Sequence, residues 1–72
     1  MNNVTLYSTN CPRCVILETK LKQKNIKYLV KNSEEDLQEL FDEGFREMPV
    51  LEVDNTKYTF GEAVKMINNY SE

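Results

Sequence analysis

Ligands for a metal ion are scarce in this sequence. Its 72 residues include no histidine and only two cysteines. A structural zinc site takes four ligands, so the cysteines of one chain would supply half a site, and a second chain would have to complete it. We therefore expect no metal centre within a single chain.

Long apolar runs and blocks of basic residues are also missing. No apolar segment approaches the ~20 residues that a membrane-spanning helix needs, so we expect no membrane association. Acidic and basic residues are interspersed, with a formal net charge of −3, and no basic block marks a nucleic-acid-binding surface. Residues 1–6 carry neither the basic segment nor the apolar core of a secretion signal. The expected location is the cytoplasm, and the mixed acidic surface favours a monomer.

The short chain favours one compact domain spanning residues 1–72. Two hydrophobic cores cannot be built from so few residues. A hydrophobic content of 40% fits a globular protein rather than a disordered one. Short loops are expected, because a domain of this size must bury most of its apolar surface to be stable.

The apolar pattern predicts seven elements in the order β-α-β-α-β-β-α. The first strand, helix and second strand should form a parallel, right-handed unit, and the last two strands an antiparallel hairpin. The prediction is an α/β fold with a mixed four-stranded sheet flanked by three helices. Strands are expected at residues 4–7, 26–30, 50–53 and 57–60, with loop and cap residues at 8–10 and a turn at 54–56. Helices are expected from Pro12 to about Asn25, from the cap candidates at 32–33 to Gly44, and from Gly61 to Tyr70.

Each predicted helix has an apolar stripe that should face the core, because apolar residues recur at helical spacing. The first stripe comprises Cys14, Leu17 and Leu21, broadened by Val15 and Ile16; the second comprises Leu37, Leu40, Phe41 and Phe45; the third comprises Ala63, Val64, Ile67 and Tyr70.

The chemistry of this chain is expected at Cys11-Pro12-Arg13-Cys14, which holds both cysteines. A close cysteine pair in a small cytosolic protein is more often catalytic or metal-binding than a structural staple. Four interpretations stay open: redox activity, half of a metal site, an iron–sulfur cluster shared between two subunits, and an inert remnant. The first carries the most weight.

The spacing of the two cysteines suits reversible disulfide formation. Residues three apart on a helix have Cβ atoms ~5–6 Å apart, and a disulfide needs ~3.5–4.5 Å, so a small adjustment would close the Cys11–Cys14 bond. Cys11 is expected at the helix N-terminus, where the dipole and the cation of Arg13 favour a thiolate. Pro12 fits a first helical position. Cys14, one turn further on and more buried, suits a resolving thiol.

Three motifs give the chain a resemblance to the glutaredoxin family of the thioredoxin-like fold. They are the C-P-x-C motif at residues 11–14, Met48-Pro49 ahead of the predicted hairpin, and Phe60-Gly61 at the last helix. The resemblance covers nearly the whole chain. It implies that Pro49 is a cis-proline beside the cysteines and that Met48 presents its backbone to a bound substrate. It also implies that Phe60 and Gly61 belong to the substrate site.

The sequence departs from the glutathione-using members of that family. Ser8 stands where a lysine is common, Arg13 where a tyrosine is common, and Glu47-Met48 where Thr-Val is common. Residues 60–63 read Phe-Gly-Glu-Ala, where Gly-Gly-x-Asp or Ser would hold the γ-glutamyl end of glutathione. Several glutathione contacts are therefore missing, and two glutamates would repel its carboxylates. The pattern is closer to the small glutaredoxin-like redoxins that donate electrons to ribonucleotide reductase.

The resemblance implies a dithiol–disulfide oxidoreductase, an electron-transport protein that reduces protein disulfides. The expected substrate is a protein disulfide, with ribonucleotide reductase the leading candidate. No bound cofactor is expected, because the redox-active group is the Cys11–Cys14 disulfide itself. The expected reductant is thioredoxin reductase with NADPH. Glutathione is the alternative reductant, and a non-catalytic binding or cluster-carrying module is the alternative function.

Several predicted site residues also have ordinary structural interpretations. Tyr7 lines the substrate groove or fills the core at a strand end. Arg13 tunes the thiols and docks a partner, or is a plain first-turn side chain. The corresponding alternatives for three further residues are an ordinary turn proline at Pro49, core filler at Met48 and a core residue with one exposed edge at Phe60.

Overall fold

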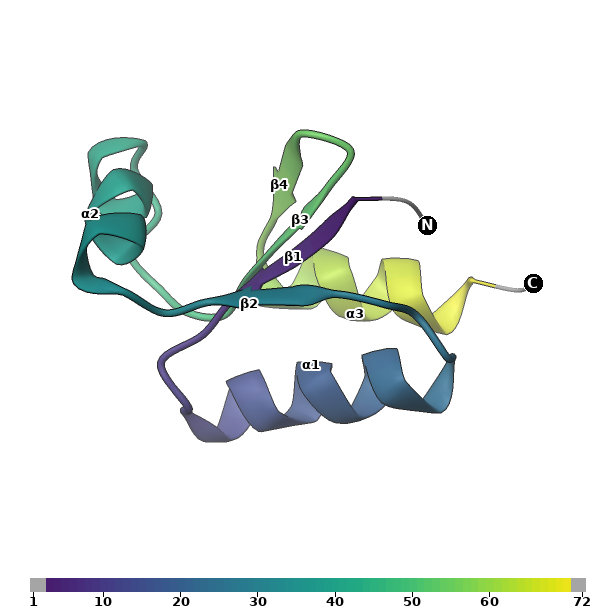
Figure 1. Cartoon of the computed structure of the whole chain (residues 1–72). Helices are drawn as coiled ribbons and strands as arrows, with labels where there is room; N and C mark the ends of the chain where they lie inside the picture. The colour runs from purple at the N-terminus through teal and green to yellow at the C-terminus, as the bar shows by residue number, and fades with distance from the viewer. Residues whose placement is uncertain (1–2, 71–72) are drawn as a thin grey trace.

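The computed structural model describes residues 3–70 and contains the seven elements in the predicted order (Figure 1). None of the helices within this range is long and apolar enough to cross a membrane. The strands are β1 (Val4–Tyr7), β2 (Leu29–Lys31), β3 (Val50–Val53) and β4 (Thr56–Tyr58). The helices are α1 (Pro12–Gln23), α2 (Glu34–Asp42) and α3 (Phe60–Asn68).

The four strands form one mixed sheet in the order β2-β1-β3-β4. β1 and β2 are parallel and β3 and β4 are antiparallel, as predicted. The antiparallel pairing of β1 with β3 joins these two units into one sheet. The hairpin turn between β3 and β4 is shorter than expected, because Thr56 already pairs with Val53. Its two central residues, Asp54 and Asn55, have φ values of 49° and 71°. Positive φ at both positions is the type I′ geometry that matches the twist of the flanking strands.

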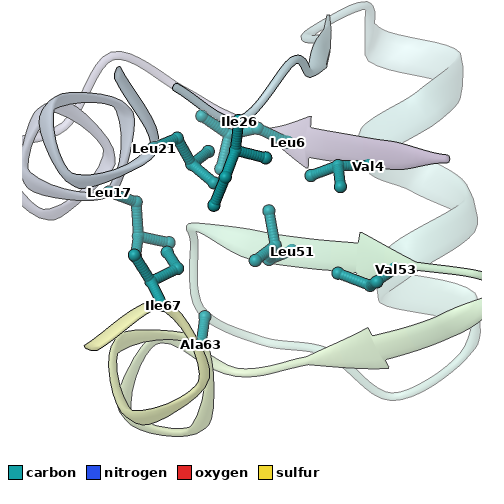
Figure 2. Close-up of a cluster of buried hydrophobic side chains, with 9 residues drawn as sticks. All are labelled: Val4, Leu6, Leu17, Leu21, Ile26, Leu51, Val53, Ala63 and Ile67. Atoms are coloured by element: carbon teal, nitrogen blue, oxygen red, sulfur yellow. The ribbon is translucent and has the colours of Figure 1, made fainter. Parts of the chain in front are cut away.

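The helices cover the two faces of the sheet unequally. In Figure 1, α1 and α3 lie together against one face and α2 lies on the opposite side. The larger buried cluster fills the space between the sheet and α1 and α3 (Figure 2). A smaller cluster of Tyr7, Leu40 and Val50 lies under α2. The larger cluster comprises Val4, Leu6, Leu17, Leu21, Ile26, Leu51, Val53, Ala63 and Ile67.

The predicted apolar stripes are confirmed at their centres and wrong at their edges. Cys14, Leu17 and Leu21 are fully buried, but Val15 is 52% exposed and Ile16 is 44% exposed. Each helical residue is rotated by about 100° from its neighbour, which places these two side chains beyond the contact with the sheet. Phe41 is likewise exposed, although Leu40 beside it is buried.

The second strand forms three residues later than its predicted start, at Leu29 instead of residue 26. Asn25 has a φ of 57° and ends α1 in the left-handed conformation that asparagine tolerates, as predicted. The turn delivers Ile26 into the larger buried cluster, where its N–H donates to the Leu21 carbonyl at 3.0 Å. Ile26 is therefore a core residue that precedes the strand. Gly44, with a φ of 100°, follows the end of α2 in the same way.

The last helix begins one residue earlier than predicted. Phe60 is the first residue of α3 and lies outside β4, which ends at Tyr58. Thr59 is the N-cap, and its N–H and hydroxyl both donate to Glu62 Oε1, at 3.3 and 2.9 Å. This contact is the capping-box pairing that starts helices, and it outweighs the strand-like character of the Tyr-Thr-Phe run.

Candidate functional site

The two cysteines lie where β1 gives way to α1, and Cys11 itself is the N-cap of the helix. Its Sγ accepts a hydrogen bond from the N–H of Cys14 at 3.3 Å. The expected caps at residues 8–10 do not take this position. Pro12 occupies the start of the helix, where its missing N–H costs nothing. The sulfur of Cys11 therefore caps the N-terminus of α1.

The thiols of Cys11 and Cys14 face each other across one helical turn. Both cysteines are free, and their Sγ atoms lie 2.7 Å apart, with one thiol donating to the other. Cys11 is half-buried and Cys14 has no exposed surface. A disulfide has a sulfur–sulfur distance of ~2.05 Å, so only a small shift closes the pair. The thiol of Cys11 is partly open to solvent, whereas that of Cys14 is not.

Hydroxyl groups from the segment between β1 and α1 surround Cys14. The Thr9 hydroxyl lies 4.0 Å from its Sγ, and the buried Ser8, 2% exposed, contributes a further hydrogen bond. Burial raises the pKa of the Cys14 thiol, but hydrogen bonds from the Cys11 side chain, the Thr9 backbone and the Ser8 side chain outweigh it and lower the pKa. A lowered pKa increases the thiolate fraction of the buried cysteine.

The sequence pattern predicts loop and cap residues at Ser8 and Thr9, and it does not predict their contacts with Cys14. The available signal was two hydroxyl side chains between a strand end and the first cysteine. Ser8 is held in place by its backbone, whose N–H donates to the Lys31 carbonyl at 3.1 Å. Its hydroxyl also accepts from the Asn10 N–H at 3.1 Å.

The Met48-Pro49 segment lies directly beside the cysteines. The Met48–Pro49 peptide bond is cis and Pro49 is fully buried. The Cys11 thiol donates to the Met48 carbonyl oxygen at 3.8 Å. The structure therefore brings Cys11 and the loop before β3 into contact, and the backbone of Met48 borders the exposed thiol.

A pocket of about 200 Å³ opens next to this contact. Phe45, Met48, Pro49 and Phe60 supply most of its apolar wall, and Arg46 and Glu47 also line it. Arg13 contacts one residue of this wall, because its guanidinium lies over the Phe60 ring, 5.4 Å from the centroid. Gly61, the next residue, is exposed at the start of α3.

Tyr7 lies in the core rather than in the pocket. Its side chain is 4% exposed and belongs to the cluster under α2. Its hydroxyl donates to Glu52 at 3.4 Å, and Lys31 lies over its ring at 5.8 Å. A side chain with so little surface cannot contact a substrate, so the core interpretation of Tyr7 replaces the substrate-binding one.

Carboxylates and cysteines do not converge into a metal site in the part of the chain that the structure describes. Within residues 3–70, no three histidine, cysteine, aspartate or glutamate side chains gather closely enough to hold an ion.

Comparison with known proteins identifies the fold. No model of a known protein family matches the sequence, and no curated protein does. Among the solved structures that match, the following two align with nearly the full chain. NrdH-redoxin from Escherichia coli, a glutaredoxin-like protein with a thioredoxin-like activity profile, matches with a TM-score of 0.82 and 20% identity, covering 97% of this chain and 96% of that one. A mutant of the thioredoxin-like protein BC3987 matches with a TM-score of 0.73 and 24% identity, covering 96% and 97%.

The chain therefore has the thioredoxin-like fold in its short, glutaredoxin-like form, as the sequence predicted. At these identities the likeness establishes the fold. What the site does has to be argued from its own residues.

Proposed function

We propose that this chain is a dithiol–disulfide oxidoreductase that reduces protein disulfides and serves as an electron donor of the ribonucleotide-reductase type. The observation that carries the proposal is the pair of free thiols, one partly exposed and one buried, 2.7 Å apart at the N-terminus of α1. This asymmetry suits a nucleophile and a resolving group. The cytoplasm, which keeps thiols reduced, is the compartment we propose.

In the first step, the Cys11 thiolate attacks one sulfur of the substrate disulfide. A Cys11–substrate disulfide forms, the substrate sulfur–sulfur bond breaks, and the departing sulfur takes a proton from water. The pocket beside Cys11 and the backbone of Met48 are available to hold the substrate during this attack. Pro12 and Pro49 support the site by fixing the backbone on either side of the thiol.

In the second step, the Cys14 thiolate attacks the sulfur of Cys11. The Cys11–Cys14 disulfide forms, the mixed disulfide breaks, and the second substrate thiol leaves with a proton. The substrate gains two electrons and two protons, and the protein loses them. Cys14 is oriented for attack within the same molecule, and such groups reach effective molarities of ~10⁵ M or more.

Thioredoxin reductase with NADPH is the reductant we favour for returning the disulfide to dithiols. Glu47 lines the pocket and Glu62 lies exposed at the start of α3, where two negative charges disfavour the carboxylates of glutathione. Ser8, in place of the lysine of glutathione-using proteins, is buried against Cys14 and offers no cation. The likeness to NrdH-redoxin, itself glutaredoxin-like with a thioredoxin-like activity profile, is in keeping with this choice.

The test is to measure NADPH consumption with insulin as the disulfide sink. One reaction contains thioredoxin reductase, and the other contains glutathione with glutathione reductase. Turnover with thioredoxin reductase alone is the expected result. Turnover with glutathione alone would assign the chain to the glutathione-dependent class. Failure in both reactions would remove the oxidoreductase proposal and leave a non-catalytic module.

A further inference from the structure

We propose that Arg13 selects the substrate, by pairing with a carboxylate that flanks the disulfide in an extended protein segment. This inference rests on the proposed oxidoreductase function and assigns it a substrate class: protein disulfides with an acidic residue next to the cysteine under attack. Arg13 is thereby a specificity-determining residue rather than a plain first-turn side chain.

The position of Arg13 suits this role. It follows Cys11 by two residues in the first turn of α1, and it is exposed. That turn contains no acidic residue, so no neighbouring carboxylate on α1 neutralises the guanidinium. The other two helices differ, since Glu34, Glu35 and Asp36 occupy the first turn of α2 and Glu62 that of α3.

The side chain of Arg13 is also held in place by a contact that leaves its charge unpaired. Its guanidinium carbon lies over the Phe60 ring, 5.4 Å from the centroid, which is a cation–π contact. A guanidinium has five N–H donors in one plane. No ion pair to Arg13 occurs among residues 3–70, so these donors are available to a carboxylate of the substrate.

The other charges around the pocket do not replace Arg13. Arg46 and Glu47 both line the pocket and are adjacent in sequence, so a carboxylate that meets Arg46 also meets Glu47. Glu62 accepts hydrogen bonds from the N–H and hydroxyl of Thr59. Along the chain, Arg13 is the cation nearest the nucleophile Cys11, two residues away.

The proposed occupant of the pocket is an extended protein segment, which suits both the apolar pocket and the positive charge of Arg13. Phe45, Met48, Pro49 and Phe60 provide an apolar wall that can take the side chain on one side of the substrate cysteine. Phe60 belongs to that wall, and the guanidinium of Arg13 lies over its ring. An acidic residue beside Arg13 and an apolar residue in the pocket satisfy both surfaces.

The experiment uses three disulfide-linked peptides, identical except for Glu, Gln or Lys beside the cysteine. Reduced full-length protein is mixed with each at pH 7 and low salt, and the second-order rate constant of reduction is measured under single-turnover conditions. Each rate is divided by that for dithiothreitol with the same peptide, which removes the intrinsic reactivity of the disulfide. We expect the Glu peptide to exceed the Lys peptide by about threefold to fivefold, the range of a partly exposed ion pair.

Arg13→Gln should bring the Glu-to-Lys ratio close to one. Lys22→Gln, which removes an exposed cation from the far end of α1, is the matched control and should leave the ratio unchanged. A ratio near one in the parent, a ratio unaffected by Arg13→Gln, or an equal fall in both variants would overturn the proposal. So would an effect of Arg13→Gln on glutathione disulfide but not on the Glu peptide.

The neutral peptide separates this inference from the proposed function. If the parent reduces the Gln peptide but shows no preference between the Glu and Lys peptides, the result supports the oxidoreductase function and overturns the proposed role of Arg13. If the parent reduces none of the peptides, the oxidoreductase function fails, and the inference fails with it. Circular dichroism of Arg13→Gln should match the parent, since the substituted side chain is exposed.

Discussion

The carbonyl oxygen of Met48 accepts a hydrogen bond from the thiol of Cys11, although the two residues are 37 positions apart in the chain. The contact ties the loop before β3 to the N-terminus of α1. Cys14, one turn further along α1, has no exposed surface of its own. In the proposed reaction, a substrate disulfide can therefore reach only Cys11, which is partly exposed.

Replacing the buried thiol should stop the reaction halfway. Cys14→Ser retains the nucleophile Cys11 but removes the group that resolves the mixed disulfide. We expect the variant to accumulate a covalent adduct with a protein disulfide substrate, with turnover reduced by a factor of about 10² or more because the intramolecular attack is lost. Mass spectrometry under non-reducing conditions detects the adduct. Turnover at the parent rate would contradict the two-thiol scheme.

Ser8 should control the pH dependence of the second step. Its side chain helps to lower the pKa of the Cys14 thiol, so Ser8→Ala should raise that pKa and move the pH profile of mixed-disulfide resolution upward. At pH 7 the step should slow by about twofold to tenfold, the equivalent of one hydrogen bond of roughly 0.5–1.5 kcal/mol. Stopped-flow measurement of substrate release across pH gives the profile. Thr19→Ala, which removes an exposed hydroxyl elsewhere on α1, should leave the profile in place.

Two adjacent residues of α1 should differ sharply in their effect on stability. Leu17 is fully buried in the larger cluster, whereas Ile16 is 44% exposed. Leu17→Ala should lower the free energy of unfolding by roughly 2–5 kcal/mol, because it removes buried methyl groups and leaves a cavity. Ile16→Ala should cost less than about 1 kcal/mol. Urea titration of both variants measures the difference, and similar losses would mean that Ile16 faces the core.

Alkaline pH should destabilise the fold. Burial and the nearby Glu52 raise the pKa of Tyr7 above 10.0, burial and a carboxylate raise that of Tyr28, and a hydrogen bond to Glu43 raises that of Lys57 above 10.5. A group whose pKa is raised on folding stabilises the fold fully below its unfolded pKa and loses that contribution as pH rises through its folded pKa.

The free energy of unfolding, measured by urea titration between pH 8 and 11.5, should therefore decline above about pH 10. Tyr7→Phe should make the decline shallower, because one of the three titrating groups is removed. A free energy that stays flat over this range would show that the three groups titrate alike in the folded and unfolded chains.

The order of the elements was predictable because it depends on local patterns. Asn25 and Gly44 end their helices as their conformational preferences suggest. The parallel pairing of β1 with β2 and the antiparallel pairing of β3 with β4 follow from the connection lengths, whereas the pairing of β1 with β3 does not. The start of α3 was harder to predict, because Tyr58, Thr59 and Phe60 suit a strand as well as a helix N-terminus. The hydrogen bonds from Thr59 to Glu62 settle it in favour of the helix.

The site was predictable only in part. Cys11 and Cys14 are three positions apart in the chain, so their spacing alone predicts the thiol pair. Whether Tyr7 meets the substrate or the core depends on where α2 packs, which no local pattern fixes. The part played by Ser8 depends on the path of the chain between β1 and α1, which folds its side chain back toward Cys14.

The sequence by itself determined the seven elements, the α/β class and the position of the reactive pair, because propensity, capping and periodicity act over a few residues. The tertiary structure alone decided what surrounds that pair: the Met48 carbonyl on Cys11, the ring of Phe60 under Arg13, and the burial that separates Cys11 from Cys14. These contacts join segments up to 47 residues apart, from Arg13 to Phe60. They exist only once the sheet and its three helices have packed, since packing is what brings distant segments within contact distance.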